Sequence, residues 1–231
     1  MIPLRDNLPV RRFPVITVAL IAANVAVFLL LYRYLLAPES ARMVFLRYGL
    51  IPRELTSGVT LAPHPFPVGV TLFSSMFVHG GLFHVAGNML YLWIFGNNVE
   101  DAMGRARFLL FYLLSGLGAA FSQVLAGPSS TIPMVGASGA VSGVLGAYLL
   151  LYPHARVLTL ITLGWFWRVV EIPAVIVLGF WIVVQVVNGL LAFSFQGGGV
   201  AWFAHIGGFA AGMVLLPFFK RRTVSVRLFR R

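Results

Sequence analysis

The sequence predicts an all-α protein that crosses a membrane several times. Of its 231 residues, 59% are hydrophobic and only 10% are charged, whereas soluble domains are about half apolar and about a quarter charged. Apolar runs that approach the roughly 20 residues of a spanning helix recur along the chain. The basic residues between these runs are unevenly distributed, and this asymmetry predicts how the helices are oriented.

Six apolar runs predict six spanning helices. The first run follows Arg11 and Arg12; it is longer than a signal-peptide core and lacks a clean cleavage site, so we interpret it as a retained helix. The predicted helices cover about 14–36, 80–98, 107–127, 138–152, 172–193 and 201–219. The predicted organisation is a cytoplasmic flank at 1–13, a membrane domain at 14–219 and a basic cytoplasmic tail at 220–231.

Two connections between the predicted helices are themselves partly apolar. Residues 37–79 mix Leu, Val and Phe with several prolines, which favours a loop lying on the membrane interface over a disordered spacer. Residues 156–170 contain Trp165, Trp167 and Arg168, which are typical of an interfacial turn before the fifth helix.

The basic residues predict that both ends of the chain are cytoplasmic. With the first helix entering from inside, thirteen basic residues fall in inside segments and four in the first outside connection, as the positive-inside rule requires. The net charge of +11 therefore indicates membrane flanks rather than nucleic-acid binding, because there is no polar domain with a basic and aromatic face. The absence of cysteine excludes disulfides, thiolate metal sites and a cysteine nucleophile.

The fourth predicted helix is too short to cross the membrane. Its 15 residues, Ser138 to Tyr152, span about 22 Å at 1.5 Å per residue, against about 30 Å of hydrocarbon. Pro153 closes the inner end, so the outer end is expected to begin below the outer surface. Residues 127–137 must then descend as irregular backbone, which is tolerated only against protein or a water-filled cavity. We expect a wet pocket with Ser138 at its floor.

Ser138 begins this helix within Gly136-Ala137-Ser138-Gly139. The free N–H groups of Ser138 and Gly139 and the helix dipole favour developing negative charge there, and the glycines permit a sharp turn and close approach of a substrate backbone. This is the geometry that an acyl-transfer nucleophile needs. Taken alone, however, small residues at such spacing more often mean close helix packing.

His205 is the candidate base for this serine. It lies about one turn into the last helix, at the depth expected for Ser138, and ionisable residues inside membranes are functional candidates. Gly208 and Gly212 below it match Gly139 and Gly143 below the serine, so the two helices can approach closely. The alternative is a histidine that only bonds a neighbouring helix. No acid lies within a predicted span, so a Ser–His dyad is all that the chain can make.

The second predicted helix carries polar groups that can complete such a site. His84 and Asn88 lie at i and i+4 on one face and can donate hydrogen bonds to an oxyanion, or they can simply join helices. His79 is interpreted as structural. In the fifth helix, Gln185 and Asn188 are interpreted as residues that hydrogen-bond between helices.

Together these residues resemble the rhomboid family of intramembrane serine proteases over roughly 70–217. The resemblance rests on the Gly136–Gly139 segment, on His205 with Gly208 and Gly212, and on His79, His84 and Asn88 at their spacing. It implies a six-helix rhomboid-like bundle with Ser138 as nucleophile, His205 as general base, and His84 and Asn88 as oxyanion donors beside the N–H groups of Ser138 and Gly139. It also implies a structural role for Glu100 in Val99-Glu100-Asp101, as for Gly136, Gly208 and Gly212.

The resemblance further implies transmembrane protein substrates, a lipid bilayer as surroundings, a prokaryotic cell membrane as location, and no cofactor or metal. Two positions depart from the family: Ser142 stands where many bacterial members have a tyrosine stacked on the imidazole, and Val70-Thr71 replaces a Trp-Arg pair. The alternatives are an inactive member that binds transmembrane clients and a small transporter, although inverted repeats are not evident. The sequence leaves the oligomeric state open.

Overall fold

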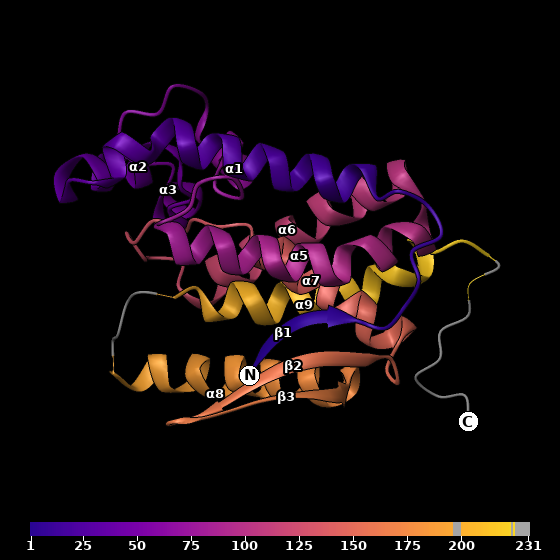
Figure 1. Ribbon diagram of the computed structural model, residues 1–231. Coiled ribbons are helices and arrows are strands. Elements are labelled where there is room, and N and C mark those ends of the chain that lie inside the picture. Colours follow the sequence, from indigo (N-terminus) through magenta and orange to yellow (C-terminus); the bar gives the residue numbers. More distant parts are fainter. Residues whose placement is uncertain (196–199, 223, 225–231) are drawn as a thin grey trace.

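The long helices of the chain run roughly along one direction and lie side by side (Figure 1). This computed structural model describes residues 1–195, 200–222 and 224. The long helices are α1 (Val15–Leu35), α5 (Leu82–Met103), α6 (Arg105–Ala126), α7 (Ser138–Leu151), α8 (Ala174–Phe195) and α9 (Trp202–Phe219). Each corresponds to one predicted span, and the chain is therefore a polytopic helical membrane protein.

Helices α1, α6, α8 and α9 are long and apolar enough to cross a membrane within the described part of the chain. Helix α7 is apolar but has only 14 residues, or about 21 Å, so the predicted short helix is confirmed. Helix α5 has 22 residues but carries more polar side chains. It continues to Met103 rather than ending at 98, because Gly104 with a φ of 88° is the residue that ends it.

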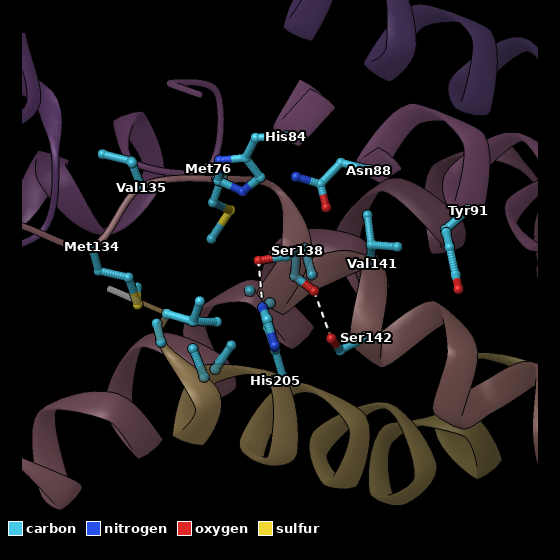
Figure 2. A pocket seen from close by; sticks show the side chains of 18 of the residues that line it. Met76, His84, Asn88, Tyr91, Met134, Val135, Ser138, Val141, Ser142 and His205 are labelled. Atoms are coloured by element: carbon cyan, nitrogen blue, oxygen red, sulfur yellow. Dashed lines mark hydrogen bonds between the residues drawn. The ribbon is translucent and has the colours of Figure 1, made fainter. Parts of the chain in front are cut away.

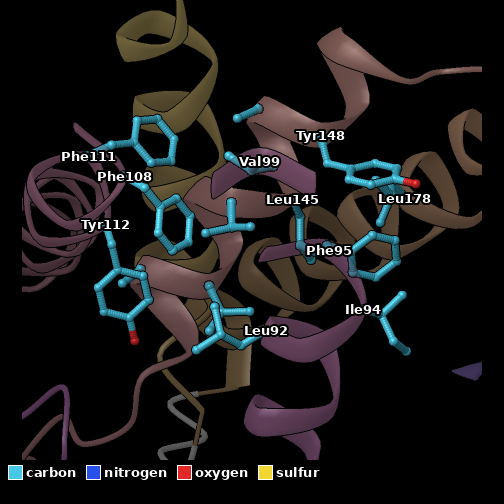
Figure 3. Packing of buried hydrophobic residues seen from close by; sticks show 14 of the residues in the cluster. Leu92, Ile94, Phe95, Val99, Phe108, Phe111, Tyr112, Leu145, Tyr148 and Leu178 are labelled. Atoms are coloured by element: carbon cyan, nitrogen blue, oxygen red, sulfur yellow. The ribbon is translucent and has the colours of Figure 1, made fainter. Parts of the chain in front are cut away.

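Helix α7 is the centre of the bundle, packed between α5, α6 and α9. Almost all its side chains are buried. Figure 3 shows Leu145 and Tyr148 of α7 in a cluster with Phe95 of α5 and Phe108 and Tyr112 of α6. Lipid is as apolar as these side chains, so close packing rather than escape from water holds such helices together.

Glycines set the distance between α7 and α9. A Cβ atom at Gly212 would overlap the carbonyl oxygen of Gly143, and one at Gly208 would overlap that of Gly139. The small-residue faces anticipated on these two helices therefore meet, and this approach fixes Ser138 against the first turn of α9.

A three-stranded antiparallel sheet was not anticipated. Strand β1 (Ile2–Asp6) pairs with β2 (Arg156–Leu163), which pairs with β3 (Phe166–Pro173). The prediction of an interfacial turn at 156–170 was wrong, because two runs rich in β-branched residues are joined there by a tight turn at Gly164, whose φ is 58°. The sheet lies beside α8 in Figure 1, with β1 against α5 and the hairpin against α8.

The sheet also ties the 1–13 flank to the helices. Asp6 Oδ2 accepts hydrogen bonds from Asn98 Nδ2 at 2.8 Å and from Tyr148 Oη at 2.6 Å. Strand β1 is therefore anchored to both α5 and α7, and the flank is an integral part of the fold. Of the basic tail expected at 220–231, only 220–222 and 224 lie inside the described residues.

The connections alternate between the two ends of the bundle. At the end where α5 and α9 finish, Arg221 N–H donates to Ala102 O at 3.0 Å. At the other end, Arg53 N–H donates to Ser130 O at 3.0 Å and Leu50 forms a bridge with Met134. The segments that meet at each end are those that the predicted topology places on one side of the membrane.

The long first connection is folded rather than a disordered spacer. It contains α2 (Pro38–Tyr48), α3 (Pro52–Ser57), a 3-10 turn (Val68–Val70) and α4 (Thr71–Ser74). The buried carboxylate of Glu54 holds it together: it accepts the N–H groups of Leu61 and Ala62 and lies 2.8 Å from His64 Nε2. This folded segment packs against the 127–137 loop and thereby supports the chain that leads to Ser138.

Candidate active site

A cavity of about 410 Å³ opens beside the first turn of α7, within the size range of small-molecule sites. Helix α5 contributes His84 and Asn88 to its wall, α8 contributes Trp181 and Gln185, and α9 contributes His205. Ser138 lies at the point where these elements converge (Figure 2). The cavity is thus assembled from α4 to α9 and the descending 127–137 loop.

Ser138 and His205 form a direct hydrogen bond across the cavity. His205 Nε2 lies 2.8 Å from Ser138 Oγ, although the two residues are 67 positions apart in the sequence. This is the reach required between a nucleophile and its base. The approach follows from the glycine contacts between α7 and α9, and from Gln123 of α6, whose Oε1 accepts the N–H of Ala204 at 3.2 Å.

The turn before Ser138 needs a glycine. Gly136 has a φ of 121°, which other residues rarely adopt, and a Cβ atom there would lie 2.7 Å from His84 Nε2. The N–H of Gly136 donates to Ser75 O at 2.8 Å. These contacts hold the loop close to His84 of α5 and to the C-terminal end of α4, and they deliver the chain into α7 at a fixed angle.

His79 supports the same turn from the other side. Its Nε2 accepts the N–H of Ala137 at 3.3 Å, and its Nδ1 lies 3.3 Å from Phe77 O. Burial, with a smaller contribution from nearby His84, lowers the pKa of His79 to about 4. The neutral form is the one that can accept from Ala137 while donating from Nδ1, so its contacts agree with the structural part expected of this residue.

Hydrogen-bond donors converge on the space next to Ser138 Oγ. His84 Nδ1 accepts the N–H of Gly80 at 3.3 Å, so the ring proton is on Nε2, at the pocket. Asn88 Nδ2 is buried and has no partner among the described residues. Helix α7 begins without a side-chain cap, which leaves the first N–H groups, those of Ser138 and Gly139, open. Such donors can stabilise an oxyanion.

The imidazole of His205 is surrounded by groups that sequence reasoning did not assign to it. The ring centroids of Trp181 and Trp202 lie 5.9 Å and 6.2 Å from that of His205, and Gln185 Oε1 lies 2.8 Å from His205 Nδ1. Ser142 Oγ donates instead to Ser138 O at 2.6 Å. Aromatic residues are common on lipid-facing surfaces, so nothing in the sequence marks these two tryptophans as neighbours of the site.

The remaining predicted residues lie away from the dyad. Glu100 accepts the N–H groups of Ile16 and Thr17 at 3.0 Å and 2.8 Å and caps the start of α1, which fits a structural part. Asn188 Nδ2 donates to Val184 O of its own helix at 2.8 Å rather than to another helix as expected. Among the described residues, no group of three His, Cys, Asp or Glu side chains could hold a metal ion.

Comparisons with known proteins place the chain among similar sequences. A family model described as Rhomboid domain matches residues 69–222. RHOMBOID-like protein 1 of Arabidopsis thaliana is 30% identical over 222 residues, which cover 88% of this chain and 52% of that protein. The mitochondrial Rhomboid protein 1 of Saccharomyces cerevisiae is 38% identical over 93 residues, 38% of this chain and 27% of that protein.

A bacterial relative carries the word protease in its name. Rhomboid protease GluP of Bacillus subtilis is 34% identical over 151 residues, which cover 63% of this chain and 26% of that protein. The chain spans between about a quarter and about half of the length of these curated relatives.

Proposed function

Since the chain belongs to the rhomboid family, we propose that it is an intramembrane serine protease whose nucleophile is Ser138 and whose general base is His205. The observation that carries the proposal is the 2.8 Å hydrogen bond between these two side chains. It lies in a cavity at the start of a helix too short to span the membrane. A hydroxyl beside a neutral imidazole is the minimal arrangement for acyl transfer.

The proposed reaction begins when a substrate transmembrane segment unwinds locally and presents a peptide carbonyl to Ser138. His205 Nε2 takes the hydroxyl proton as Oγ attacks the carbonyl carbon. The resulting oxyanion is stabilised by His84 Nε2–H, Asn88 Nδ2 and the N–H groups at the start of α7. The imidazolium then gives its proton to the leaving amine, which separates and leaves an acyl-enzyme.

Water completes the cycle. A water molecule in the cavity attacks the acyl carbon while His205 Nε2 accepts its proton. Collapse of the second tetrahedral intermediate releases the new carboxyl terminus and returns the proton to Ser138 Oγ. Every step uses neutral or transiently charged groups of the chain, so the described mechanism requires no carboxylate beside the imidazole.

A serine-reactive fluorophosphonate probe tests the nucleophile. The protein in detergent should be labelled, and Ser138→Ala and His205→Ala should each lose labelling and turnover of a model transmembrane substrate. Ser57→Ala and His154→Ala change exposed residues of the same types and should be labelled like the wild type. Equal labelling of all five proteins would refute the proposal. Labelling without turnover of any transmembrane substrate would favour a client-binding protein.

We also propose that the cavity faces the outer side of a prokaryotic cell membrane, with both ends of the chain in the cytoplasm. The excess of basic residues in the inside segments supports this orientation. Some relatives are named mitochondrial or chloroplastic, and another comes from a bacterium. Cell fractionation of the native host therefore tests in which membrane the protein resides. Protease accessibility of tags placed at Ser57 and at Lys220 decides the orientation.

A further inference from the structure

Gln185 reaches the site from α8, a helix that contributes neither the nucleophile nor the base. We propose that Gln185 is a positioning residue that holds the His205 imidazole in the tautomer and orientation needed to accept the Ser138 proton. This inference rests on the proposed function. It names Gln185 as the residue that orients the His205 imidazole, since Ser142 bonds Ser138 O instead.

The hydrogen bonds around Gln185 fix the direction of its amide. Gln185 Nε2 donates to the carbonyl oxygen of Trp181, one turn earlier, at 3.2 Å. A carbonyl oxygen only accepts, so the amide nitrogen must face Trp181. The amide oxygen therefore faces His205, where Oε1 lies 2.8 Å from Nδ1. The reverse orientation would place two acceptors together on one side.

The direction of the amide then fixes the proton on the imidazole. Because Gln185 Oε1 can only accept, His205 Nδ1 must carry the hydrogen. The neutral ring therefore keeps its lone pair on Nε2, 2.8 Å from Ser138 Oγ. The opposite tautomer would turn Nε2 into a donor toward the serine and remove the base. One chain of contacts thus runs from the Trp181 carbonyl through Gln185 and His205 to Ser138.

A neutral partner suits this depth in the membrane. Gln185 is 6% exposed, and a carboxylate buried there would be costly. No described carboxylate contacts His205; His84 of α5 is the titratable group that faces it across the cavity. The indoles of Trp181 and Trp202 restrict the ring from two sides. Gln185 thus supplies orientation without bringing a charge, and its oxygen still accepts when the imidazole is protonated.

Three substitutions in α8 separate positioning from packing. Gln185→Leu keeps a side chain of similar size but removes the acceptor, and Gln185→Glu keeps an acceptor and adds a charge. Asn188→Leu removes an amide that donates to Val184 O of its own helix. We expect Gln185→Leu to lower kcat about tenfold, equal to about 1.4 kcal/mol, with KM within about twofold. Asn188→Leu should match the wild type in both constants.

The pH dependence of kcat/KM would stay unchanged if Gln185 served only to pack α8 against α9. Gln185→Glu should keep part of the activity, because it retains an acceptor for His205 Nδ1 but loses the donor to Trp181 O. The acidic limb of its kcat/KM profile should move about one unit to higher pH, because a carboxylate favours the protonated imidazole. Full kcat in Gln185→Leu, or an unchanged acidic limb in Gln185→Glu, would overturn the positioning role. If Gln185→Leu does not fold, the acidic limb of the kcat/KM profile of Gln185→Glu is sufficient to test the positioning role.

The same series distinguishes this inference from the proposed function. Loss of probe labelling in Ser138→Ala and His205→Ala, combined with wild-type behaviour of both Gln185 variants, would leave the protease intact and remove only the role of Gln185. Labelling that survives in Ser138→Ala would instead remove the proposed function itself.

Discussion

The side-chain amides of Gln185 and Asn88 differ in how fully their hydrogen-bonding groups are used in this site. Gln185 uses both of its amide atoms, one on Trp181 O and one on His205 Nδ1. Asn88 keeps a buried Nδ2 without a partner among the described residues. An unsatisfied buried donor costs about 1–3 kcal/mol of stability, and such a cost is typical of a group reserved for a ligand or a transition state.

Replacement of Asn88 should therefore separate stability from activity. We expect Asn88→Leu, which keeps the branching of the side chain and removes the unsatisfied donor, to raise the apparent Tm in detergent or leave it unchanged. The same change should lower kcat by about 10²–10³, as for other oxyanion donors. Thermal unfolding and turnover of one substrate measure both quantities. A variant that retains full kcat would exclude Asn88 from the oxyanion site.

His79 should make the fold sensitive to mild acid. The pKa of His79 is lowered to about 4 by burial, whereas an unfolded histidine has a pKa of about 6.5. The unfolded chain therefore binds more protons between these values, so this residue's contribution to stability is complete above about pH 6.5 and declines as the pH falls toward 4. Between pH 7 and pH 5 the expected loss is about 2 kcal/mol.

The measurement compares the loss of apparent Tm between pH 7 and pH 5 in a variant with the same loss in the wild type. The loss of apparent Tm between pH 7 and pH 5 should be smaller in His79→Gln than in the wild type, because glutamine does not titrate. His154→Gln, at an exposed position, is the control and should retain the wild-type loss. Equal pH dependence in all three proteins would contradict the assignment.

At the scale of the elements, the helix pair α7–α9 is the part of the site that sequence reasoning placed best. The shortness of α7 and the glycine faces followed from counting residues, since depth and small-residue spacing depend on local sequence alone. The hydrogen-bond partner of His205 Nδ1 could not be predicted in this way. Gln185 and Asn188 are three residues apart with similar side chains, and which of them faces α9 depends on how α8 is rotated in the bundle.

The sheet escaped prediction for a related reason. In a soluble protein, the β-branched residues of 156–173 would stand out against polar loops. Here they are flanked by apolar helices of similar hydropathy, so a hairpin and an interfacial segment look alike. The alternation of strand residues is also obscured, because most side chains of β3 are exposed or half-buried whatever their type.

The close approach of α7 and α9 predicts a large effect of one methyl group. A Cβ atom at Gly212 would overlap the Gly143 carbonyl oxygen, so Gly212→Ala must push the helices apart and lengthen the Ser138–His205 distance. We expect a destabilisation of about 1–3 kcal/mol and a fall in kcat larger than the fall in folded protein. Thermal unfolding and probe labelling per folded molecule measure the two effects.

Gly179 provides the matched control for Gly212. It lies inside α8, and a Cβ atom there would have nothing within 4 Å. Gly179→Ala should be neutral or stabilising by about 0.5–1 kcal/mol, because alanine favours a helix over glycine. If both alanine variants behaved alike, the contact between α7 and α9 would not be what limits the site.

At the scale of the whole molecule, polar contacts near the C-terminal end of α5 join four elements. Asp6 of β1 accepts from Asn98 of α5 and Tyr148 of α7, while Glu100 of α5 caps α1. The family and the bundle were predictable because they rest on composition and a few motifs. These contacts were not, since they join residues up to 142 positions apart.

Asp6→Ala should therefore weaken the fold without touching the cavity. Loss of two hydrogen bonds to a carboxylate is expected to cost about 2–4 kcal/mol, and the apparent Tm at a fixed scan rate should fall by several degrees. Asp101→Ala removes a carboxylate whose contact is a 3.4 Å bond to the exposed Arg11 N–H, and it should change Tm little. An Asp6→Ala protein as stable as wild type would show that β1 is not needed.

Strand β1 and its partner β2 are far apart in the order of synthesis. The ribosome makes Ile2–Asp6 before α1, yet the residues that pair with them follow only after α7. Contacts between segments so far apart in sequence form slowly. Strand β1 must therefore remain without its partner strand until α1, α5, α6 and α7 have been made, and only then can the sheet form beside them.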